Sequence, residues 1–214
     1  MTRQTQLNLI RIAFLVLFLA VIVSGKMVLW LLIFALTLPV AILFGRIYCG
    51  YICPMNTVML AADKLANLGK KPHRRRSAPR WLQQAAIPWL MLLLTVATLL
   101  LARRLLHIEL PILPFLVILS FVITLFYKPE VFHNFICPFG ALQKLFGRWS
   151  LRSHRVTPSA CIGCRKCEKV CPALAVAVSA ETKKAVIDPS LCHQCQNCSL
   201  VCPTKAISWR KKAD

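Results

Sequence analysis

Acidic residues are scarce in this chain, and positive charge is plentiful. Its 214 residues include seven Asp and Glu against 27 Lys and Arg, which gives a net charge of +20. Such an excess is typical of nucleic-acid-binding proteins, but also of membrane proteins, whose Lys and Arg gather in cytoplasmic loops. Residues 46–80 hold eight of the 27 and residues 128–212 hold fourteen, whereas Lys26, Arg103 and Arg104 are alone in the other two connections. This alternation indicates membrane topology and argues against a nucleic-acid partner.

Charge is also missing from long apolar runs, which argues against an ordinary soluble domain. Hydrophobic residues make up 57% of the chain and the mean hydropathy is +0.63. A cleaved signal peptide is the alternative for the first run, but no clean small-x-small site follows it and a second run begins at once. Runs of this length are sufficient to cross a bilayer. The sequence therefore predicts four transmembrane helices, over Leu7–Val23, Met27–Phe44, Trp81–Leu101 and Leu110–Tyr127.

The charge pattern also predicts an orientation and a domain division. With a basic amino end and four spans, both termini, residues 46–80 and everything after Tyr127 lie in the cytoplasm, as in a multi-pass protein of the bacterial inner membrane. The 11 cysteines then face a reducing compartment, which argues against disulfides. We expect a mainly α-helical membrane domain over residues 1–150 and a small polar domain over residues 151–214.

A weak internal repeat divides the membrane part into two pseudo-repeated pairs of helices. Residues 7–68 and residues 81–149 each read as two spans, then a Cys-Pro pair, then an amphipathic segment. The Cys-Pro pairs are at 53–54 and 137–138, and Cys49 and His133 hold equivalent places four residues before each cysteine. Duplicated membrane halves often enclose a site between them.

Eight cysteines form two runs with C-x2-C-x2-C-x3-C-P spacing, the bacterial ferredoxin pattern for 4Fe–4S clusters. Zinc sites use pairs of cysteines rather than this full run, so zinc is a poor alternative. Because the fourth cysteine of such a run ligates the other cluster, the pattern predicts a crossed ligand set. Residues 173–188 read as a small hairpin, in keeping with an α+β domain. Cluster I is assigned to Cys161, Cys164, Cys167 and Cys202, and cluster II to Cys192, Cys195, Cys198 and Cys171.

The other three cysteines lie at the predicted cytoplasmic edge of the membrane. If the two halves pack about a pseudo-twofold axis, Cys49, Cys53, His133 and Cys137 converge, and they then suit a third metal centre or iron–sulfur cluster. The alternatives are a redox-active thiol role and small buried thiols at helix starts.

Three histidines and one glutamate are weaker candidates. His107 and Glu109, in the outer connection, are an ionisable pair at a bilayer surface, suited to taking protons from a quinol; the alternative is a solvated loop. His193 lies inside a cluster loop, where it is placed to tune a potential by hydrogen bonding, although serine or glycine would fit there equally well. His73 is expected to face solvent.

The combination of motifs resembles the NapH/NosR/MauN group of membrane-bound ferredoxins. Cys49-Gly-Tyr-Ile-Cys53-Pro-Met-Asn is similar to the first NapH-type motif, and Ile136-Cys137-Pro-Phe-Gly-Ala-Leu to the second NosR-type motif. The chain departs from the group at His133, where a cysteine is usual, and because it is shorter than most members we expect no large extra domain. The resemblance implies oxidation of membrane quinol and transfer of electrons to another iron–sulfur or cytochrome subunit. Related ferredoxins of the CcoG type are linked to copper reduction.

Three functions follow as hypotheses. The first is a quinol-linked electron-transfer protein, with lipid, quinone and a redox protein as partners. The second is a copper reductase or metallocentre-assembly factor that works through the membrane-edge residues. The third is a non-catalytic anchor and relay within a larger complex.

Overall fold

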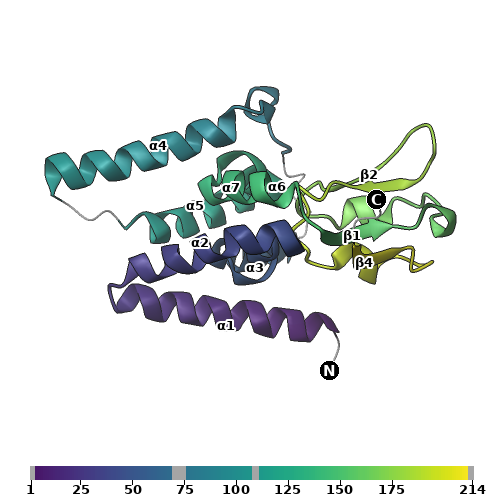
Figure 1. The fold of residues 1–214 in the computed structure, drawn as a ribbon, viewed down its shortest axis with the longest axis horizontal. Coiled ribbons are helices and arrows are strands. Elements are labelled where there is room, and N and C mark those ends of the chain that lie inside the picture. Colours follow the sequence, from purple (N-terminus) through teal and green to yellow (C-terminus); the bar gives the residue numbers. More distant parts are fainter. Residues whose placement is uncertain (1–2, 69–75, 108–110, 212–214) are drawn as a thin grey trace. The chain divides into compact units, whose positions relative to one another are not determined.

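The computed structural model describes residues 3–68, 76–107 and 111–211 (Figure 1). Contacts divide the chain into two compact units. Unit 1 comprises Met1–Val28 and Cys53–Leu142, and unit 2 comprises Leu29–Ile52 and Gln143–Asp214. The cysteine-rich C-terminal region therefore shares a unit with most of the second apolar helix. The expected domain boundary at residue 150 stays a prediction, because these units follow contacts and not chain order.

Three helices in the described residues are long and apolar enough to cross a membrane. They are α1 (Arg3–Val23), α2 (Met27–Phe44) and the continuous helix Ile87–Leu105, formed by α4 (Ile87–Leu101) with the π-helical turn η3 (Ala102–Leu106). The bounds of α2 are those that the sequence predicts. The fourth apolar helix, α5 (Ile112–Phe126), has 15 residues and is shorter than the others. At 1.5 Å per residue it measures about 22 Å, against a hydrocarbon core of about 30 Å.

The third apolar helix begins later than predicted. Trp81 lies in a short 3-10 helix, η2 (Arg80–Gln83), where its side chain is exposed. The α-helix starts at Ile87 with Pro88 in its first turn. Proline suits this position because it lacks an N–H and its fixed φ matches the helix. The expected start at Trp81 is therefore wrong by about two turns of helix.

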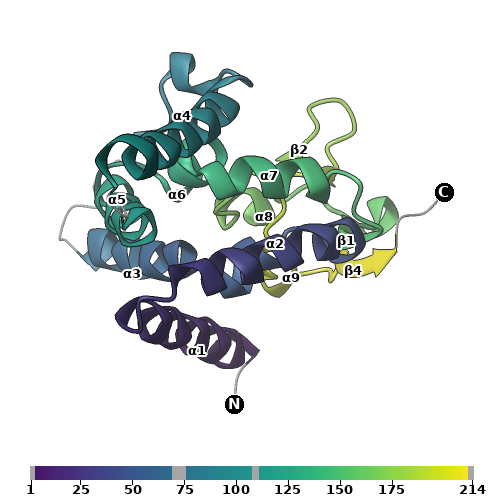
Figure 2. The same ribbon diagram turned by 60° about the vertical axis from the view of Figure 1, so that its left-hand side comes forward.

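Unit 1 is organised around the amphipathic helix α3 (Pro54–Leu68), which packs against α1 and α5 (Figure 2). Met55, Met59 and Ala62 are buried along it at the spacing of one helix face. The helix starts at Pro54, directly after Cys53. The predicted amphipathic segment over residues 55–68 thus forms a packing element of the helical unit.

The two halves of the chain repeat the same local structure at their Cys-Pro motifs. A five-residue π-helical turn, η1 (Tyr48–Ile52), leads to Cys53 and to α3. After the short helix α6 (Pro129–Val131), a second π-helical turn, η4 (Phe132–Ile136), leads to Cys137 and to α7 (Pro138–Gly147). Cys49 and His133 are each the second residue of their turn. Such turns are rare and are frequent at functional sites.

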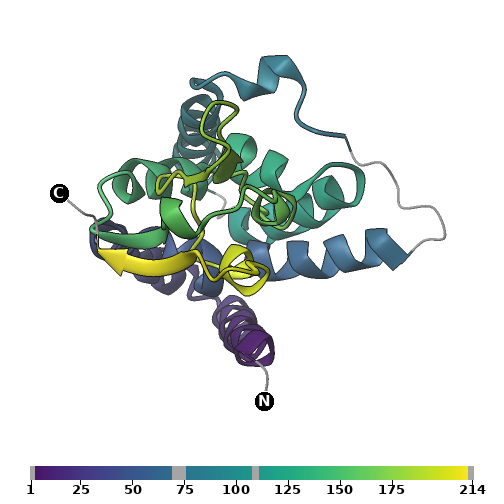
Figure 3. The same cartoon turned by 90° about the vertical axis from the view of Figure 1, so that its right-hand side faces the viewer.

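The C-terminal part of unit 2 is a small α+β fold with two antiparallel strand pairs. Strand β1 (Arg152–Val156) pairs with β4 (Ile207–Lys211), seen as green and yellow arrows in Figure 3. Strand β2 (Val176–Val178) pairs with β3 (Ala185–Ile187), which is the predicted hairpin. A 3-10 turn, η5 (Pro158–Ala160), precedes the first cysteine run. Two short helices, α8 (Lys166–Lys169) and α9 (Asn197–Leu200), occupy equivalent places in the two runs.

The core of this small fold is built partly from thiols. Cys161, Cys167, Cys192 and Cys198 are buried in one apolar cluster with small aliphatic residues of the strands and connections, namely Ala173, Ala175, Val176, Ala185, Ile187, Ala206 and Ile207. The cysteine side chains therefore occupy the interior that larger apolar residues fill in most domains.

Candidate metal centres

Four of the predicted ligands line a single pocket. Cys161, Cys164 and Cys167 come from the first run, and Cys202, the last cysteine of the second run, joins them there. Cys164 is exposed, whereas Cys161 and Cys167 are buried. The pocket thus gathers the crossed set of thiols assigned to cluster I.

The backbone of both cysteine loops is bent by left-handed residues at matching positions. Gly163 and Arg165 have φ of 70° and 59°, and Gln194 and Gln196 have φ of 57° and 67°. At Gly163 a side chain is also excluded by space, because a Cβ would collide with the carbonyl oxygen of Lys183. Two left-handed residues in each loop allow three closely spaced cysteines to follow a tight curve.

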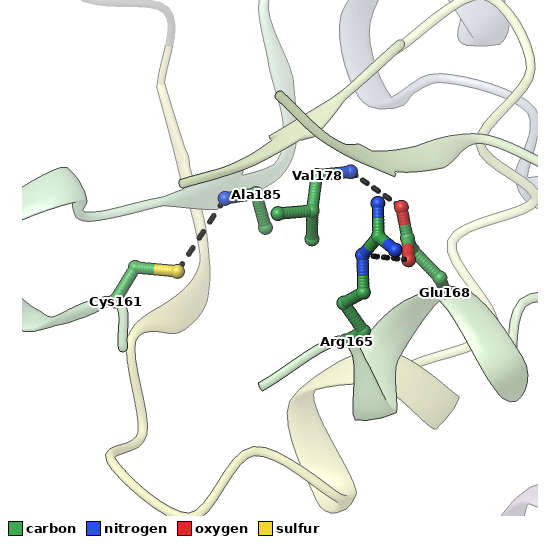
Figure 4. Close-up of polar contacts among 5 residues, drawn as sticks. All are labelled: Cys161, Arg165, Glu168, Val178 and Ala185. Atoms are coloured by element: carbon green, nitrogen blue, oxygen red, sulfur yellow. Dashed lines mark hydrogen bonds and ion pairs between the residues drawn. The ribbon is translucent and has the colours of Figure 1, made fainter. Parts of the chain in front are cut away.

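Hydrogen-bond donors lie beside the sulfur atoms of both sets. The backbone N–H of Ala185 donates to Cys161 Sγ over 3.4 Å (Figure 4), and that of Ala175 donates to Cys171 Sγ over 3.3 Å. Thr204 Oγ1 lies 3.7 Å from Cys202 Sγ. Donors of this kind stabilise negative charge on sulfur and tune the reduction potential of a cluster.

Glu168 connects the first cysteine run to the hairpin. Its Oε1 accepts a hydrogen bond from the backbone N–H of Val178 over 2.5 Å, and its Oε2 pairs with Arg165 Nε over 3.3 Å (Figure 4). One carboxylate therefore holds both the left-handed Arg165 and strand β2 in place around the first pocket.

The second set of four thiols is more deeply buried. Burial raises the pKa of Cys192 to about 12; the backbone N–H of Gln194 opposes this shift, and the neighbouring thiolates of Cys195 and Cys171 add to it. Burial also raises the pKa of Cys198, followed by repulsion from the other three. These mutual effects require the four thiols to lie close together, although Cys171 belongs to the first run.

Cys202 has the opposite electrostatic setting. Burial acts to raise its pKa, but it is outweighed by hydrogen bonds from the Thr204 hydroxyl and the N–H groups of Ala206, Thr204 and Ile207, so the pKa is lowered. The pKa values of the cysteines in this small fold thus differ in direction: that of Cys202 is lowered, whereas those of Cys192 and Cys198 are raised. Metal binding at the second set has to displace protons.

Both sets fit a 4Fe–4S cluster by the chemistry of their donors. Each offers four thiols in proximity, a loop of the required tightness and N–H groups beside sulfur. The assignment of individual ligands remains a prediction that cluster-specific variants test.

The membrane-edge residues are all buried, but they are distributed over both units. Cys49 belongs to unit 2, and Cys53, His133 and Cys137 belong to unit 1. His133 Nε2 lies 3.2 Å from Oδ1 of Asn56, on helix α3. Within residues 3–68, 76–107 and 111–211, no three His, Cys, Asp or Glu side chains are grouped closely enough for a single metal ion. A third metal centre therefore stays a prediction.

Arg46 is a residue of the site region that the sequence reading missed. It is the second residue after the end of α2 and is completely buried, with 0% exposure. Its Nη2 donates to Cys49 Sγ over 3.6 Å and its Nη1 to the carbonyl oxygen of Ser190 over 3.4 Å, just before the second cysteine run. In the sequence, an arginine after an apolar helix looks like one more cytoplasmic charge.

The second cysteine loop also packs tightly on residues 45–51. A Cβ at Gly50 would collide with the carbonyl oxygen of His193, whose side chain is buried, and one at Gly45 would lie 2.5 Å from Gln194 Nε2. The Tyr51 hydroxyl donates to the Gln194 carbonyl over 2.7 Å and accepts from Gln196 Nε2 over 3.0 Å. His193 thus contributes its backbone to this contact.

An apolar cavity of about 450 Å³ lies within unit 1 between α4 and α5. Thr95 and Thr98 are among its walls, and Ile136 and Pro138 line it on either side of Cys137 in the chain. His107 is exposed, with a left-handed φ of 51°, and is not among the lining residues. Glu109, its predicted partner for quinol chemistry, lies outside the described residues, as does His73.

Comparison with known families finds iron–sulfur domains that match parts of this chain. The 4Fe-4S dicluster domain matches residues 160–206, and the 4Fe-4S binding domain matches twice, at residues 26–75 and 110–156. The two latter matches cover the two membrane-edge motifs. The chain is thus similar to 4Fe–4S ferredoxin-type proteins in these regions, and three helices among its described residues are long and apolar enough to cross a membrane.

Two individual proteins are similar to this chain over about two thirds of its length. The methylamine utilization ferredoxin-type protein MauN of Paracoccus denitrificans is 30% identical over 145 residues, 64% of this chain and 51% of MauN. An uncharacterised protein of Methanocaldococcus jannaschii is 28% identical over 141 residues, 64% of this chain and 55% of the relative. The chain spans about half the length of both. The MauN match confirms the NapH/NosR/MauN resemblance, and no solved structure matches the chain.

Proposed function

We propose that this protein is a membrane-bound electron relay that links the membrane quinol pool to a redox partner through two 4Fe–4S clusters. The observation that carries the proposal is the composition of unit 2. Both four-cysteine sets lie there together with Leu29–Ile52, most of an apolar helix and the turn that follows it. Cluster-binding residues and a candidate membrane span thus belong to one compact body.

The membrane arrangement that we propose has four spans, with α5 as the shortest. Its 15 mostly apolar residues form a helix that crosses a bilayer if the flanking residues extend it or the lipid thins around it. Four spans place the basic segments 46–80 and 128–212 on the same side. The cluster domain then faces the cytoplasm of the bacterial inner membrane.

The cavity between α4 and α5 supports a quinone partner. Its volume of about 450 Å³ falls within the range of small-molecule sites, roughly 300–1,000 Å³, and its walls are mainly apolar. Ile136 and Pro138 bring its lining to the second Cys-Pro motif. A quinone held there lies in the helical unit that carries Cys53, His133 and Cys137.

The clusters supply one-electron chemistry when bound, and the residues around them tune their reduction potentials and hold the cysteine loops in place. N–H groups of Ala175 and Ala185 stabilise charge at sulfur, and Glu168 holds the first loop on the hairpin. The buried thiols of the second set exclude water from their cluster, which affects its potential.

A basic surface beside the first cysteine run suits an acidic partner protein. Arg165, Lys166 and Lys169 follow the exposed Cys164, and complementary charge speeds and orients docking. We expect the partner to be another iron–sulfur or cytochrome subunit.

The test of this function uses the full chain in lipid nanodiscs under anaerobic conditions. A short-chain quinol analogue is added, and cluster reduction is followed by optical bleaching and by electron paramagnetic resonance (EPR). Reduction by the quinol, with quinone bound in stoichiometric amount, is the expected result. A protein whose intact clusters are reduced by dithionite but neither bind quinone nor respond to quinol would refute the link to the quinol pool.

A copper reductase or metallocentre-assembly factor is the second candidate. The 4Fe-4S binding domain matches cover the membrane-edge residues, and the buried Arg46 lies against Cys49 Sγ. Cu(II) reduction that is lost in Cys53→Ala, but kept in a variant with His107 and Glu109 both replaced, favours this candidate. A third candidate is an anchor and relay without its own substrate, which co-purification of stoichiometric partners distinguishes from the first.

A further inference from the structure

Among the described residues of unit 2, Arg46 is a fully buried cation with no acidic side chain paired to it. Its side chain is completely buried, and it donates hydrogen bonds to the sulfur of Cys49 and to the carbonyl of Ser190, whereas its Nε has no hydrogen-bond partner among the described residues. A buried charge is strongly unfavourable unless an opposite charge is near it. The position therefore calls for a negative charge that no carboxylate of the described residues supplies.

A 4Fe–4S cluster held by four thiolates is an anion that gains charge on reduction. The second cysteine run begins at Cys192, two residues after the Ser190 carbonyl that Arg46 contacts. Cys192 itself is deeply buried, so little water screens charges around it. Arg46 thus lies at the start of the loop that is assigned to cluster II.

The same loop is attached to residues 45–51 at several further points. The His193 carbonyl packs on Gly50, Gln194 packs on Gly45, and Tyr51 bonds to the backbone and side chain of the loop. Phe44, the last residue of α2, stacks on Trp209 of β4 with ring centroids 6.0 Å apart. The loop of the first run meets the hairpin instead, through Gly163 and Lys183, and its Cys164 is exposed.

We propose that cluster II is the membrane-facing cluster, docked on the end of α2, and that Arg46 is the positioning residue that holds its loop and raises its potential. Cluster I is then the outer cluster, which exchanges electrons with the partner protein. The inference rests on the proposed function, since it presumes that both clusters are present. It fixes the spatial order of the relay whichever way electrons flow.

Potentials of the two clusters are measured by EPR-monitored redox titration of the full chain in nanodiscs. Each signal is assigned with Cys164→Ser for cluster I and Cys195→Ser for cluster II. In Arg46→Met, which keeps bulk and removes charge, the potential of cluster II should fall while that of cluster I stays. Arg46→Lys should restore most of the difference. Arg148→Met is the matched control, because this arginine of unit 2 is exposed, lies outside both cysteine runs, and has its charge screened by water.

Unchanged potentials in Arg46→Met, or a shift confined to cluster I, would overturn the inference. A second measurement uses the unaltered protein, so it does not depend on folding of the variant. A soluble dysprosium chelate should enhance spin relaxation of cluster I more than that of cluster II, and an equal or reversed effect contradicts the order. A failure of the proposed function would be distinguishable from these results, because the clusters would then be absent or would not be reduced by quinol.

Discussion

Replacing Gly50 by alanine should damage the cluster II region while leaving the cluster I region intact. An alanine Cβ would lie much closer to the His193 carbonyl oxygen than the 3.0 Å that real Cβ atoms keep, and 3.3 Å from the carbonyl carbon. Because the obstacle is backbone, a side-chain rotation does not relieve it. The second cysteine loop has to move away from the turn that contains Cys49.

The size of the effect follows from two opposing terms. Overpacking of this kind costs about 1–3 kcal/mol. Alanine in place of glycine in a helical turn returns about 1 kcal/mol at most. The holo-protein should therefore lose up to about 2 kcal/mol of unfolding free energy, measured by denaturant unfolding in detergent. The EPR signal of cluster II should broaden or disappear, and that of cluster I should persist.

Gly25→Ala is the control for this prediction. Gly25 has φ of 70°, but nothing lies within 4 Å of a Cβ there. The variant should lose about 1–2 kcal/mol through backbone strain alone, with both cluster signals unchanged. If Gly50→Ala leaves cluster II and the stability as they are in the parent, the tight packing of loop and turn is not what holds the second site together.

Three further predictions concern the thiols and their supports. In cluster-free protein near pH 8, iodoacetamide should alkylate Cys202 well before Cys192 and Cys198, as followed by mass spectrometry. The reason is that the pKa of Cys202 is lowered, whereas the pKa values of Cys192 and Cys198 are raised. The reverse order of alkylation would contradict these pKa shifts. The raised pKa of Cys192 contributes stability to the folded, cluster-free protein that is fully present below pH 9 and is lost as the pH rises towards 12. The denaturant midpoint of unfolding should therefore fall over that pH interval. A midpoint that rises there would be incompatible with a buried thiol. Glu168→Gln should weaken the hydrogen bond from the Val178 N–H and remove the ion pair with Arg165. The unfolding free energy should fall by about 1 kcal/mol, and the EPR signal of cluster I should shift. Glu181→Gln is the exposed control, and it should change neither the stability nor the signal.

Much of the fold is encoded in local patterns and is readable from the sequence. The charge-free run Met27–Phe44 forms a helix with those bounds, because unbroken apolar sequence specifies a span without help from tertiary contacts. The hairpin of β2 and β3 forms where two short apolar strands flank a polar turn. The pairing of β1 with β4 cannot be predicted from the sequence, since Arg152–Val156 is mostly polar and its partner strand, Ile207–Lys211, is far along the chain.

The same distinction applies to the candidate site. Cysteine spacing identifies both ligand sets because cluster geometry dictates the spacing. Arg46 is missed because its burial depends on a contact with Ser190, far along the chain, and a lone arginine after a span reads as a topology signal. Trp81 is read as the start of a span from its amphipathic character, but Pro88 sets the helix start. Tertiary packing determines the burial of Arg46, whereas the start of the third helix follows from the local effect of Pro88.

The most direct test of the central claim is to measure iron, acid-labile sulfide and the low-temperature EPR spectrum on one dithionite-reduced sample. Two 4Fe–4S clusters predict about eight iron atoms and eight sulfides per chain, with two reduced-cluster signals that interact magnetically. Cys202→Ser should then perturb the signal of cluster I, although it lies in the second run. Zinc in place of iron, or about four iron atoms in protein prepared without oxygen, would contradict the account.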